Sequence, residues 1–454
     1  MSRDQDKRLY TLSEEEPFKT VVKMGVPLIA GMFIMVLYNL VDTYFIGLTG
    51  DDYQLAAVNL AYPVMMVMVA VSNMIGTGAS SFIARCLGAK DIPKAEHTLT
   101  AGMLLTVVNG AVVSAAGLIF LDEITAGLGA RDNTFLYTAQ YAGIILAGSI
   151  PTMASYTFGA FLRGEGSVRL SMVGMAAGTV VNIILDPVLI FVFDMQIRGA
   201  AAATVIGNIT GVVVSAVFYM SGKSLIRPSW RFIRPTGEIV SEIYRVGIPA
   251  SLETLLTSAA YVVNNNLAVA YGELTVAAMG VAQKVLSLGN YVYQGFASGV
   301  QPLMGYNYGS RDYCRMKKIL KAGVVTVTGT ELVLMAVYGI TAPLLIGIFT
   351  DDGEVIATGA RVLRAMMLTL PFVGSVSMTR MSFQAMGKPG YAFGITIVRQ
   401  LILYIPLLLL FDRLWGFTGL IHAQPVTELI MMAVSILLLL SFINRISKEG
   451  LKDE

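Results

Sequence analysis

The stretch "YNLVDTYFIG", residues 38–47, lies inside an apolar run that begins at Val21 and places Asp42 near the middle of a membrane-length segment. A carboxylate at bilayer depth costs roughly 2.5–3.5 kcal/mol on insertion scales. Acids at that depth usually mark ion or substrate pathways. We therefore expect a membrane protein in which Asp42 has a function, with a helix-packing hydrogen bond as the alternative.

The composition of the whole chain agrees with a membrane protein. Of its 454 residues, 55% are hydrophobic and 14% are charged, and the mean hydropathy is +0.68. An ordinary soluble domain carries about 25% charged residues. Apolar runs of spanning length predict an all-α polytopic membrane protein with twelve transmembrane helices. The runs are approximately 22–48, 54–82, 97–121, 134–160, 168–193, 199–220, 240–270, 277–306, 319–349, 355–385, 391–411 and 416–442.

Basic residues gather at the two termini and in alternate predicted loops. The opposite loops are mostly acidic, as at Asp51, Asp122 and Asp351. This distribution follows the positive-inside rule, so both termini are predicted to be cytoplasmic, in a multi-pass protein of the cell (plasma or inner) membrane. The residues assigned to the cytoplasmic side include Lys7, Arg85, Arg163, Lys223, Arg311, Arg380, Lys388 and Arg445.

An internal repeat divides the chain. "GVPLIAGMF" at residue 25 matches "GIPASLETL" at 247, and "FLRGEG" at 161 matches "QAMGKPG" at 384. Each half contains six predicted helices, so the halves are parallel repeats, expected to form two pseudo-symmetric six-helix bundles about an axis along the membrane normal. The expected divisions are an N-terminal segment 1–20, an N-lobe 21–222, a linker 223–238, a C-lobe 239–443 and a tail 444–454.

Polar residues in the fifth and sixth predicted helices supply partners for Asp42. In "VVNIILDPVLIF", residues 180–191, Asn182 and Asp186 are four apart and share one helical face. Pro187 frees backbone carbonyls beside them. In "GAAAATVIGNITG", residues 199–211, Thr204 also lies on one face with Asn208. Two carboxylates, an amide and a hydroxyl predict a pocket that holds a sodium ion or shares protons.

Two backbone features accompany this pocket. Pro27 interrupts the hydrogen bonds of the helix that carries Asp42, and predicts a place where that helix bends. The GxxxG spacings at Gly174/Gly178 and Gly207/Gly211 predict close helix packing.

"YNLVDTYFIG", "GASSFIARCLGAKD", "NIILDP", "GAAAATVIG" and the two-fold repeat resemble the multidrug and toxic compound extrusion (MATE) family over essentially the whole chain. The resemblance implies a V-shaped pair of bundles that exports cationic or amphipathic compounds in exchange for protons or sodium. It implies no cofactor beyond the coupling ion. Carried over position by position, the ion site falls on Asp42, Asn182, Asp186 and Thr204.

Weaker candidates surround this site. Tyr38 and Asn39 precede Asp42 on the same helix and are predicted to face the substrate, together with Asn208. Met175 belongs to a methionine-rich stretch that suits an adaptable apolar surface. The expected partners are small molecules and the lipid bilayer, with no nucleic acid, and the expected state is a monomer.

The C-lobe carries its own ionisable residues at membrane depth. Opposite charges at similar depth predict ion pairing, and a second proton relay that includes the histidine is the alternative. Another branch of the family has acids in the seventh and tenth helices, whereas this chain has one only in the seventh. The set is Glu253, Lys284, Glu331, Arg399, His422 and Glu428.

Two other functions compete with antiport. A flippase for lipid-linked precursors, from the same superfamily, is the runner-up, but such proteins line the cleft with cations and we expect none buried in the N-lobe. An enzyme is not expected, because the chain has no HExxH or GxSxG motif and only two histidines.

Overall fold

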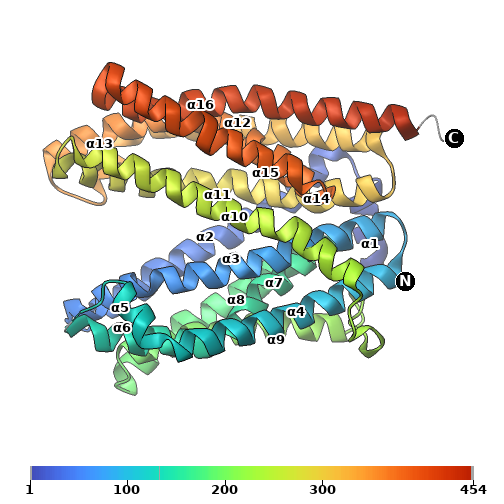
Figure 1. The fold of residues 1–454 in the computed structure, drawn as a ribbon, viewed down its shortest axis with the longest axis horizontal. Coiled ribbons are helices and arrows are strands. Elements are labelled where there is room, and N and C mark those ends of the chain that lie inside the picture. Colours follow the sequence, from blue (N-terminus) through green and yellow to red (C-terminus); the bar gives the residue numbers. More distant parts are fainter. Residues whose placement is uncertain (1–2, 132, 451–454) are drawn as a thin grey trace. The chain divides into compact units, whose positions relative to one another are not determined.

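The computed structural model describes residues 3–131 and 133–450, apart from the side chains of Asn39, Asp52, Trp230, Glu449 and Gly450. Every regular element in these residues is helical (Figure 1), so the predicted all-α class is confirmed. A helix satisfies its backbone hydrogen bonds internally, as a chain in lipid must.

Nine α-helices occupy the described part of the first half. The sixth and seventh are separated by a bend of 56°. Their bounds are α1 (Arg3–Ser13), α2 (Pro17–Gly47), α3 (Asp52–Gly88), α4 (Ile92–Ile119), α5 (Leu121–Gly127), α6 (Asn133–Ala147), α7 (Ser149–Gly164), α8 (Val168–Pro187) with the π-helical turn η1 (Val188–Val192), and α9 (Ile197–Met220).

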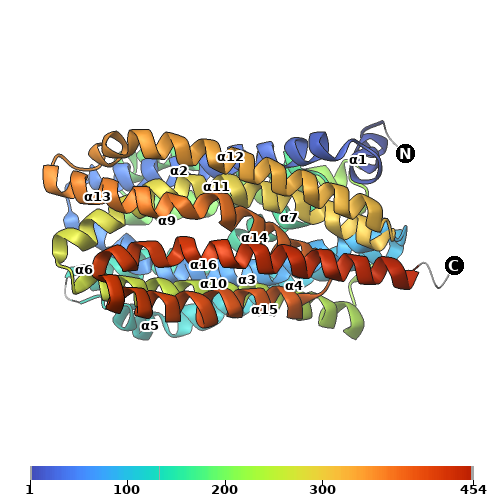
Figure 2. The same cartoon turned by 90° about the horizontal axis from the view of Figure 1, so that it is seen from above.

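The second half follows a short 3-10 turn, η2 (Trp230–Phe232), in the linker. The last helix, α16, consists of two segments that meet at Gly416, where φ is 55° and ψ is −139° (Figure 2). The bounds are α10 (Gly237–Val269), α11 (Glu273–Gly309), α12 (Tyr313–Gly347), α13 (Gly353–Met366), η3 (Met367–Thr369), α14 (Leu370–Ala385), α15 (Pro389–Ile397), η4 (Val398–Tyr404) and α16 (Ile405–Gly450).

Among the described residues, nine helices are long and apolar enough to cross a membrane, or ten if α6 and α7 form one bent span. One of them, Pro389–Lys448, has 60 residues. At 1.5 Å per residue it would be about 90 Å long, against about 30 Å for the hydrocarbon core. Its kink at Gly416 divides it into two segments of spanning length. The chain is a multi-pass membrane protein, and the count of twelve, which also needs α11, stays a prediction.

The helices form two compact units. Unit 1 contains Met1–Thr11 and Ala30–Ser251, and unit 2 contains Leu12–Ile29 and Leu252–Glu454. The unit 1 core includes Met68, Ile145 and Met153, and the unit 2 core includes Leu363 and Leu370. Helices α2 and α10 each begin in one unit and end in the other, so the units do not follow the chain order. The lobe boundaries expected from the sequence stay a prediction.

Glycines let these exchanged helix segments pack closely within their units. In unit 1, a Cβ atom on Gly78 of α3 would lie 2.1 Å from a carbonyl oxygen of α10, and one on Gly247 of α10 would lie 1.9 Å from a carbonyl oxygen of α3. In unit 2, a Cβ atom on Gly299 of α11 would lie 2.9 Å from the nitrogen of Gly25 in α2. Gly25 and Gly247 begin the matching segments of the repeat, so both halves use the same kind of contact.

A buried carboxylate joins the N-terminal helix and the linker to the loop between α7 and α8. Glu165 in that loop has no exposed side-chain surface and lies 3.8 Å from the guanidinium of Arg8. It accepts hydrogen bonds from the hydroxyls of Ser167 and Ser224, and Gln5 donates to the carbonyl oxygen of Ser224 at 2.6 Å. Burial raises the pKa of Glu165, although these partners oppose the shift. One carboxylate therefore connects three segments of unit 1.

Candidate functional site

The candidate site lies within unit 1, where α8 and α9 pack against each other. A Cβ atom on Gly178 would lie 2.5 Å from the carbonyl oxygen of Gly207, and one on Gly207 would lie 2.7 Å from the carbonyl oxygen of Gly178. The two backbones are therefore in direct contact, and the close packing predicted from the GxxxG spacings is confirmed.

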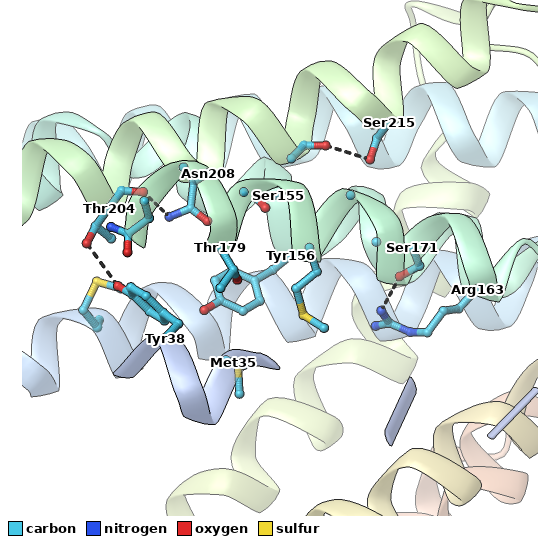
Figure 3. A pocket seen from close by; sticks show the side chains of 18 of the residues that line it. Met35, Tyr38, Ser155, Tyr156, Arg163, Ser171, Thr179, Thr204, Asn208 and Ser215 are labelled. Carbon is cyan, nitrogen blue, oxygen red and sulfur yellow. Dashed lines mark hydrogen bonds between the residues drawn. The ribbon is translucent and has the colours of Figure 1, made fainter. Parts of the chain in front are cut away.

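A cavity of about 150 Å³ lies beside this contact, with walls from α2, α3, α7, α8 and α9 (Figure 3). Tyr38, Met175 and Asn208, three of the four predicted wall residues, line it. The side chain of the fourth, Asn39, lies outside the described residues. Sites for drug-sized ligands are typically about 300–1,000 Å³, so the enclosed space suits part of such a molecule.

One end of the cavity is polar. The hydroxyl of Tyr38 lies 3.1 Å from that of Thr204 (Figure 3), and the amide of Asn208 donates to the carbonyl oxygen of Thr204 at 3.0 Å. Asn182 of α8 lines the same cavity and donates to Oδ1 of Asp186 at 3.4 Å. Helices α2, α8 and α9 thus bring their polar side chains to one place.

Two carboxylates lie behind this polar end. Asp42 is 7% exposed and Asp186 is fully buried, and the two interact electrostatically. In the described part of the chain neither forms an ion pair with a basic side chain. Among the described residues, Oδ1 of Asp42, Oδ2 of Asp186 and Oδ1 of Asn182 have no hydrogen-bond partner. Buried oxygens of this kind are stable when a proton, a water molecule or a cation satisfies them.

The structure adds one residue to this group and shows an irregular turn beside it. Tyr141 of α6 is 5% exposed and interacts with the side chain of Thr204 and electrostatically with Asp42 and Asp186. Its surroundings in sequence, "FLYTAQYAG", gave no signal that separates it from a packing aromatic. Directly after Pro187, the chain continues as the π-helical turn η1, a form that is frequent at functional sites.

Arg163 lies at the other end of the cavity. It belongs to the last turn of α7 and is half-buried, and its Nη1 donates to the hydroxyl of Ser171 at 3.1 Å (Figure 3). The sequence assigned Arg163 to a cytoplasmic loop and predicted no buried cation in this half. The loop placement is wrong, because α7 extends to Gly164. The expectation about buried cations is also wrong in part, because Arg163 is half-buried and lines the cavity. The cytoplasmic side stays a prediction.

Two acids of the C-lobe set form ion pairs with arginines in unit 2. Arg399 donates through Nε and Nη2 to Oε1 of Glu428 at 2.8 and 2.5 Å. Glu253 of α10 pairs with Arg380 of α14. The sequence placed Arg380 near the end of the predicted helix 355–385 and counted it among the cytoplasmic basic residues. It lies inside α14 and is 9% exposed. These acids are therefore neutralised by arginines.

The remaining members of the C-lobe set are not paired in this way. Glu331 of α12 is fully buried, and neither carboxylate oxygen has a hydrogen-bond partner among the described residues. Lys284 is exposed, contrary to the expectation that it is buried. Nδ1 of His422 lies 2.7 Å from the carbonyl oxygen of Thr418, one turn earlier. In the described residues no group of three or more His, Cys, Asp or Glu side chains suits a metal ion.

Comparison with known families shows two matches along the chain. The family model MatE matches residues 27–188 and again residues 249–410, two segments of equal length. One model therefore describes both halves, and the internal repeat predicted from the sequence is confirmed.

Individual relatives match over almost the whole chain. The multidrug export protein MepA of Staphylococcus saprophyticus is 30% identical over 443 residues, which cover 98% of either chain. A crystal structure of MATE in complex with MaL6 has a TM-score of 0.92 at 26% identity and covers 99% of this chain and 100% of that one. An outward-facing multidrug resistance MATE family transporter of the MOP superfamily has a TM-score of 0.91 at 27% identity and covers 96% and 98%.

Proposed function

The chain belongs to the MATE family of membrane transporters, and from this premise we propose that it is a secondary active antiporter. It would export cationic or amphipathic compounds in exchange for protons or sodium by alternating access. The similarity to a multidrug export protein over 98% of the chain supports multidrug efflux. In such an exchange the ion gradient supplies the energy for export, so we propose no cofactor beyond the coupling ion.

The observation that carries this proposal is a set of three buried oxygens, on Asp42, Asp186 and Asn182, for which the described part of the chain offers no hydrogen-bond partner. Two nearby carboxylates in a low-dielectric site cannot both stay ionised without compensation. A proton on one acid, or a sodium ion held by these oxygens and the Thr204 hydroxyl, supplies that compensation. Hard cations prefer such oxygen ligands. We therefore assign ion coupling to Asp42, Asn182, Asp186 and Thr204.

The energy available from one ion is large enough to matter. A proton or sodium ion that crosses a potential of 100 mV supplies about 2.3 kcal/mol, close to the lower cost of a carboxylate at bilayer depth, roughly 2.5 kcal/mol. Loading and release of one ion at Asp42 can thus shift the balance between two conformations. We propose that α2 bends at Pro27 when Asp42 changes its state, and that Pro187 and η1 give Asp186 similar freedom.

The proposal also assigns a substrate wall, a membrane orientation and an oligomeric state. Tyr38, Met175 and Asn208 line the cavity and are proposed to contact the substrate. Alternation of basic and acidic loops supports cytoplasmic termini in the plasma or inner membrane. We propose that the chain works as a monomer in the bilayer.

A flippase or metabolite exporter of the same superfamily is the second candidate, and Arg163 is the observation that favours it. A cation in the cavity suits an anionic group. The buried acids at the other end of the cavity favour antiport of cations as the leading proposal.

The test uses protein reconstituted in vesicles with a proton gradient or a sodium gradient imposed separately. Asp42→Asn keeps the shape of the side chain and removes its charge. We expect it to fold and to lose gradient-driven export of a cationic dye, while Asp194→Asn, at an exposed position of the same unit, keeps it. Export by Asp42→Asn at the wild-type rate, with the gradient dependence intact, would refute the proposal.

A further inference from the structure

Arg163 is unusual among the arginines of unit 1 that have little exposed surface. Arg8 lies 3.8 Å from Glu165, and Arg85 lies 2.8 Å from Glu242. Arg163 is in the same unit and is also half-buried, yet no carboxylate of the described residues pairs with it. It donates a hydrogen bond to the neutral hydroxyl of Ser171. A partly buried cation without a counter-ion is costly.

The surroundings leave the guanidinium facing the cavity. Gly159, one turn earlier on α7, has no side chain, and a Cβ atom there would lie 3.4 Å from Nη1 of Arg163 and 3.3 Å from the hydroxyl of Ser171. The guanidinium therefore lies back along α7 beside this glycine, where it lines the cavity together with Ser171 and Ser215 (Figure 3). The guanidinium carries five N–H donors in a planar fork, and the hydroxyl of Ser171 accepts a hydrogen bond from one of them.

The cavity is elongated, and its two ends differ in charge. On α8 the lining runs from Ser171 to Asn182, and on α9 from Ser215 to Thr204, so the ends are eleven positions apart in each case. At 1.5 Å per residue this is a length of about 16 Å. Arg163 stands at the Ser171 end, and Asp186 bonds Asn182 at the other end. Hydroxyl groups and methionines lie between them, so the middle suits an amphipathic body.

We propose that Arg163 binds the carboxylate, or a similar planar anionic group, of zwitterionic amphipathic substrates. The cationic end of such a substrate lies toward Tyr38, Asp42 and Asp186, about one cavity length from Arg163. A guanidinium and a carboxylate can form two parallel hydrogen bonds, a geometry that favours a planar anionic group at Arg163. The inference rests on the proposed export function and names the class of substrate for that same cavity.

The competing explanation is structural. A basic residue in the last turn of a helix interacts favourably with the helix dipole, and Arg163 occupies such a place in α7. A structural role would affect all substrates alike, whereas an anion site would distinguish molecules that differ only in their anionic group.

The experiment compares two fluorescent probes on the purified full-length protein. Tetramethylrhodamine carries a cationic ring system and a free carboxylate, and its methyl ester carries the cation alone. Fluorescence polarisation gives the dissociation constant of each probe. The measured quantity is the dissociation constant of the ester divided by that of the acid. We expect the acid to bind more tightly to the wild type. Arg163→Gln should reduce the ratio on the order of tenfold, the scale of a charge-assisted hydrogen bond.

The controls separate charge from folding. Arg163→Lys keeps the charge and should retain part of the preference, and Arg198→Gln, at an exposed position, should keep the wild-type ratio. A wild type that binds the ester as tightly as the acid would overturn the proposal without any variant. An equal loss of both probes in Arg163→Gln, with the ratio unchanged, would overturn it in favour of the structural role.

The ratio also separates this inference from the antiporter proposal. It is a binding measurement and decides the role of Arg163 whether or not a gradient drives export. Export of the methyl ester under proton and sodium gradients is measured on the same protein. Absence of export with an intact ratio would contradict antiport and leave the anion site standing.

Discussion

Replacing Gly178 with alanine tests the backbone contact that holds α8 and α9 together beside the cavity. The new Cβ atom would lie 2.5 Å from the carbonyl oxygen of Gly207, whereas ordinary contact begins near 3.4 Å. The obstacle is backbone, so no flexible side chain can move away. The two helices must separate by about 0.9 Å, the difference between these distances.

The expected cost follows from this overlap. Overpacking a well-packed contact costs typically about 1–3 kcal/mol. For a domain of 150–250 residues, 1 kcal/mol corresponds to about 2–4 °C in melting temperature. We therefore expect Gly178→Ala to lower the melting temperature of the purified protein by several degrees. It should also weaken dye export, because Asn182 on α8 and Thr204 on α9 move apart with their helices.

A matched substitution gives the opposite expectation. Gly329 lies within α12, where a Cβ atom would meet nothing within 4 Å. Alanine is favoured over glycine inside a helix by up to about 1 kcal/mol, so Gly329→Ala should leave the melting temperature unchanged or raise it. If Gly178→Ala is as stable as Gly329→Ala and exports dye normally, the contact argued from the structure is incorrect.

Two further predictions concern buried carboxylates. Burial raises the pKa of Glu165, so the folded state holds its proton more tightly than the unfolded chain, and stability should fall as pH rises through the interval between the two pKa values. Glu165→Gln should flatten this dependence in melting curves recorded from acidic to neutral pH, and an unchanged slope would contradict it. Arg399→Gln leaves Glu428 buried without its partner and should destabilise the protein by roughly 3–5 kcal/mol, whereas Glu331→Gln, which removes an unpaired acid, should not lower the melting temperature. The reverse order of the two melting temperatures would refute this reading of unit 2.

Periodic and repeated features of the chain could be predicted from its sequence. The apolar runs predicted the helices, and the matching segments at 25 and 247 predicted the repeat that one family model later described twice. The glycine spacings predicted the contact between α8 and α9. Each of these is a property of many residues acting together, so a local ambiguity does not change the outcome.

Single charged residues near helix ends could not be placed in the same way. Arg163 follows an apolar run, Arg380 lies near the end of one, and both precede turn signals, a pattern that also describes cations at the cytoplasmic ends of helices. Whether such a side chain extends to the membrane surface or turns inward depends on what the neighbouring helices offer. Arg380 turns inward to Glu253, and Arg163 turns toward a space left by Gly159. Tyr141 was missed because its role depends on Thr204 of α9, which is distant in sequence.

The repeat also supports our proposal that ion coupling belongs to one half of the chain. Pro27 and Pro249 occupy matching places at the two starts of the family match, and fifteen residues beyond them lie Asp42 and Asn264. Asn264 is 4% exposed, and its Oδ1 also has no hydrogen-bond partner within the described ranges. The second half thus keeps a buried polar group at this position but not a charge. An amide cannot exchange a proton or compensate a cation as a carboxylate does. Among the described residues, arginines neutralise Glu253 and Glu428 of unit 2, and Glu331 remains there as a single unpaired acid. Unit 1 instead holds two unpaired acids that interact with each other, Asp42 and Asp186, which is why we propose this unit as the site of ion coupling.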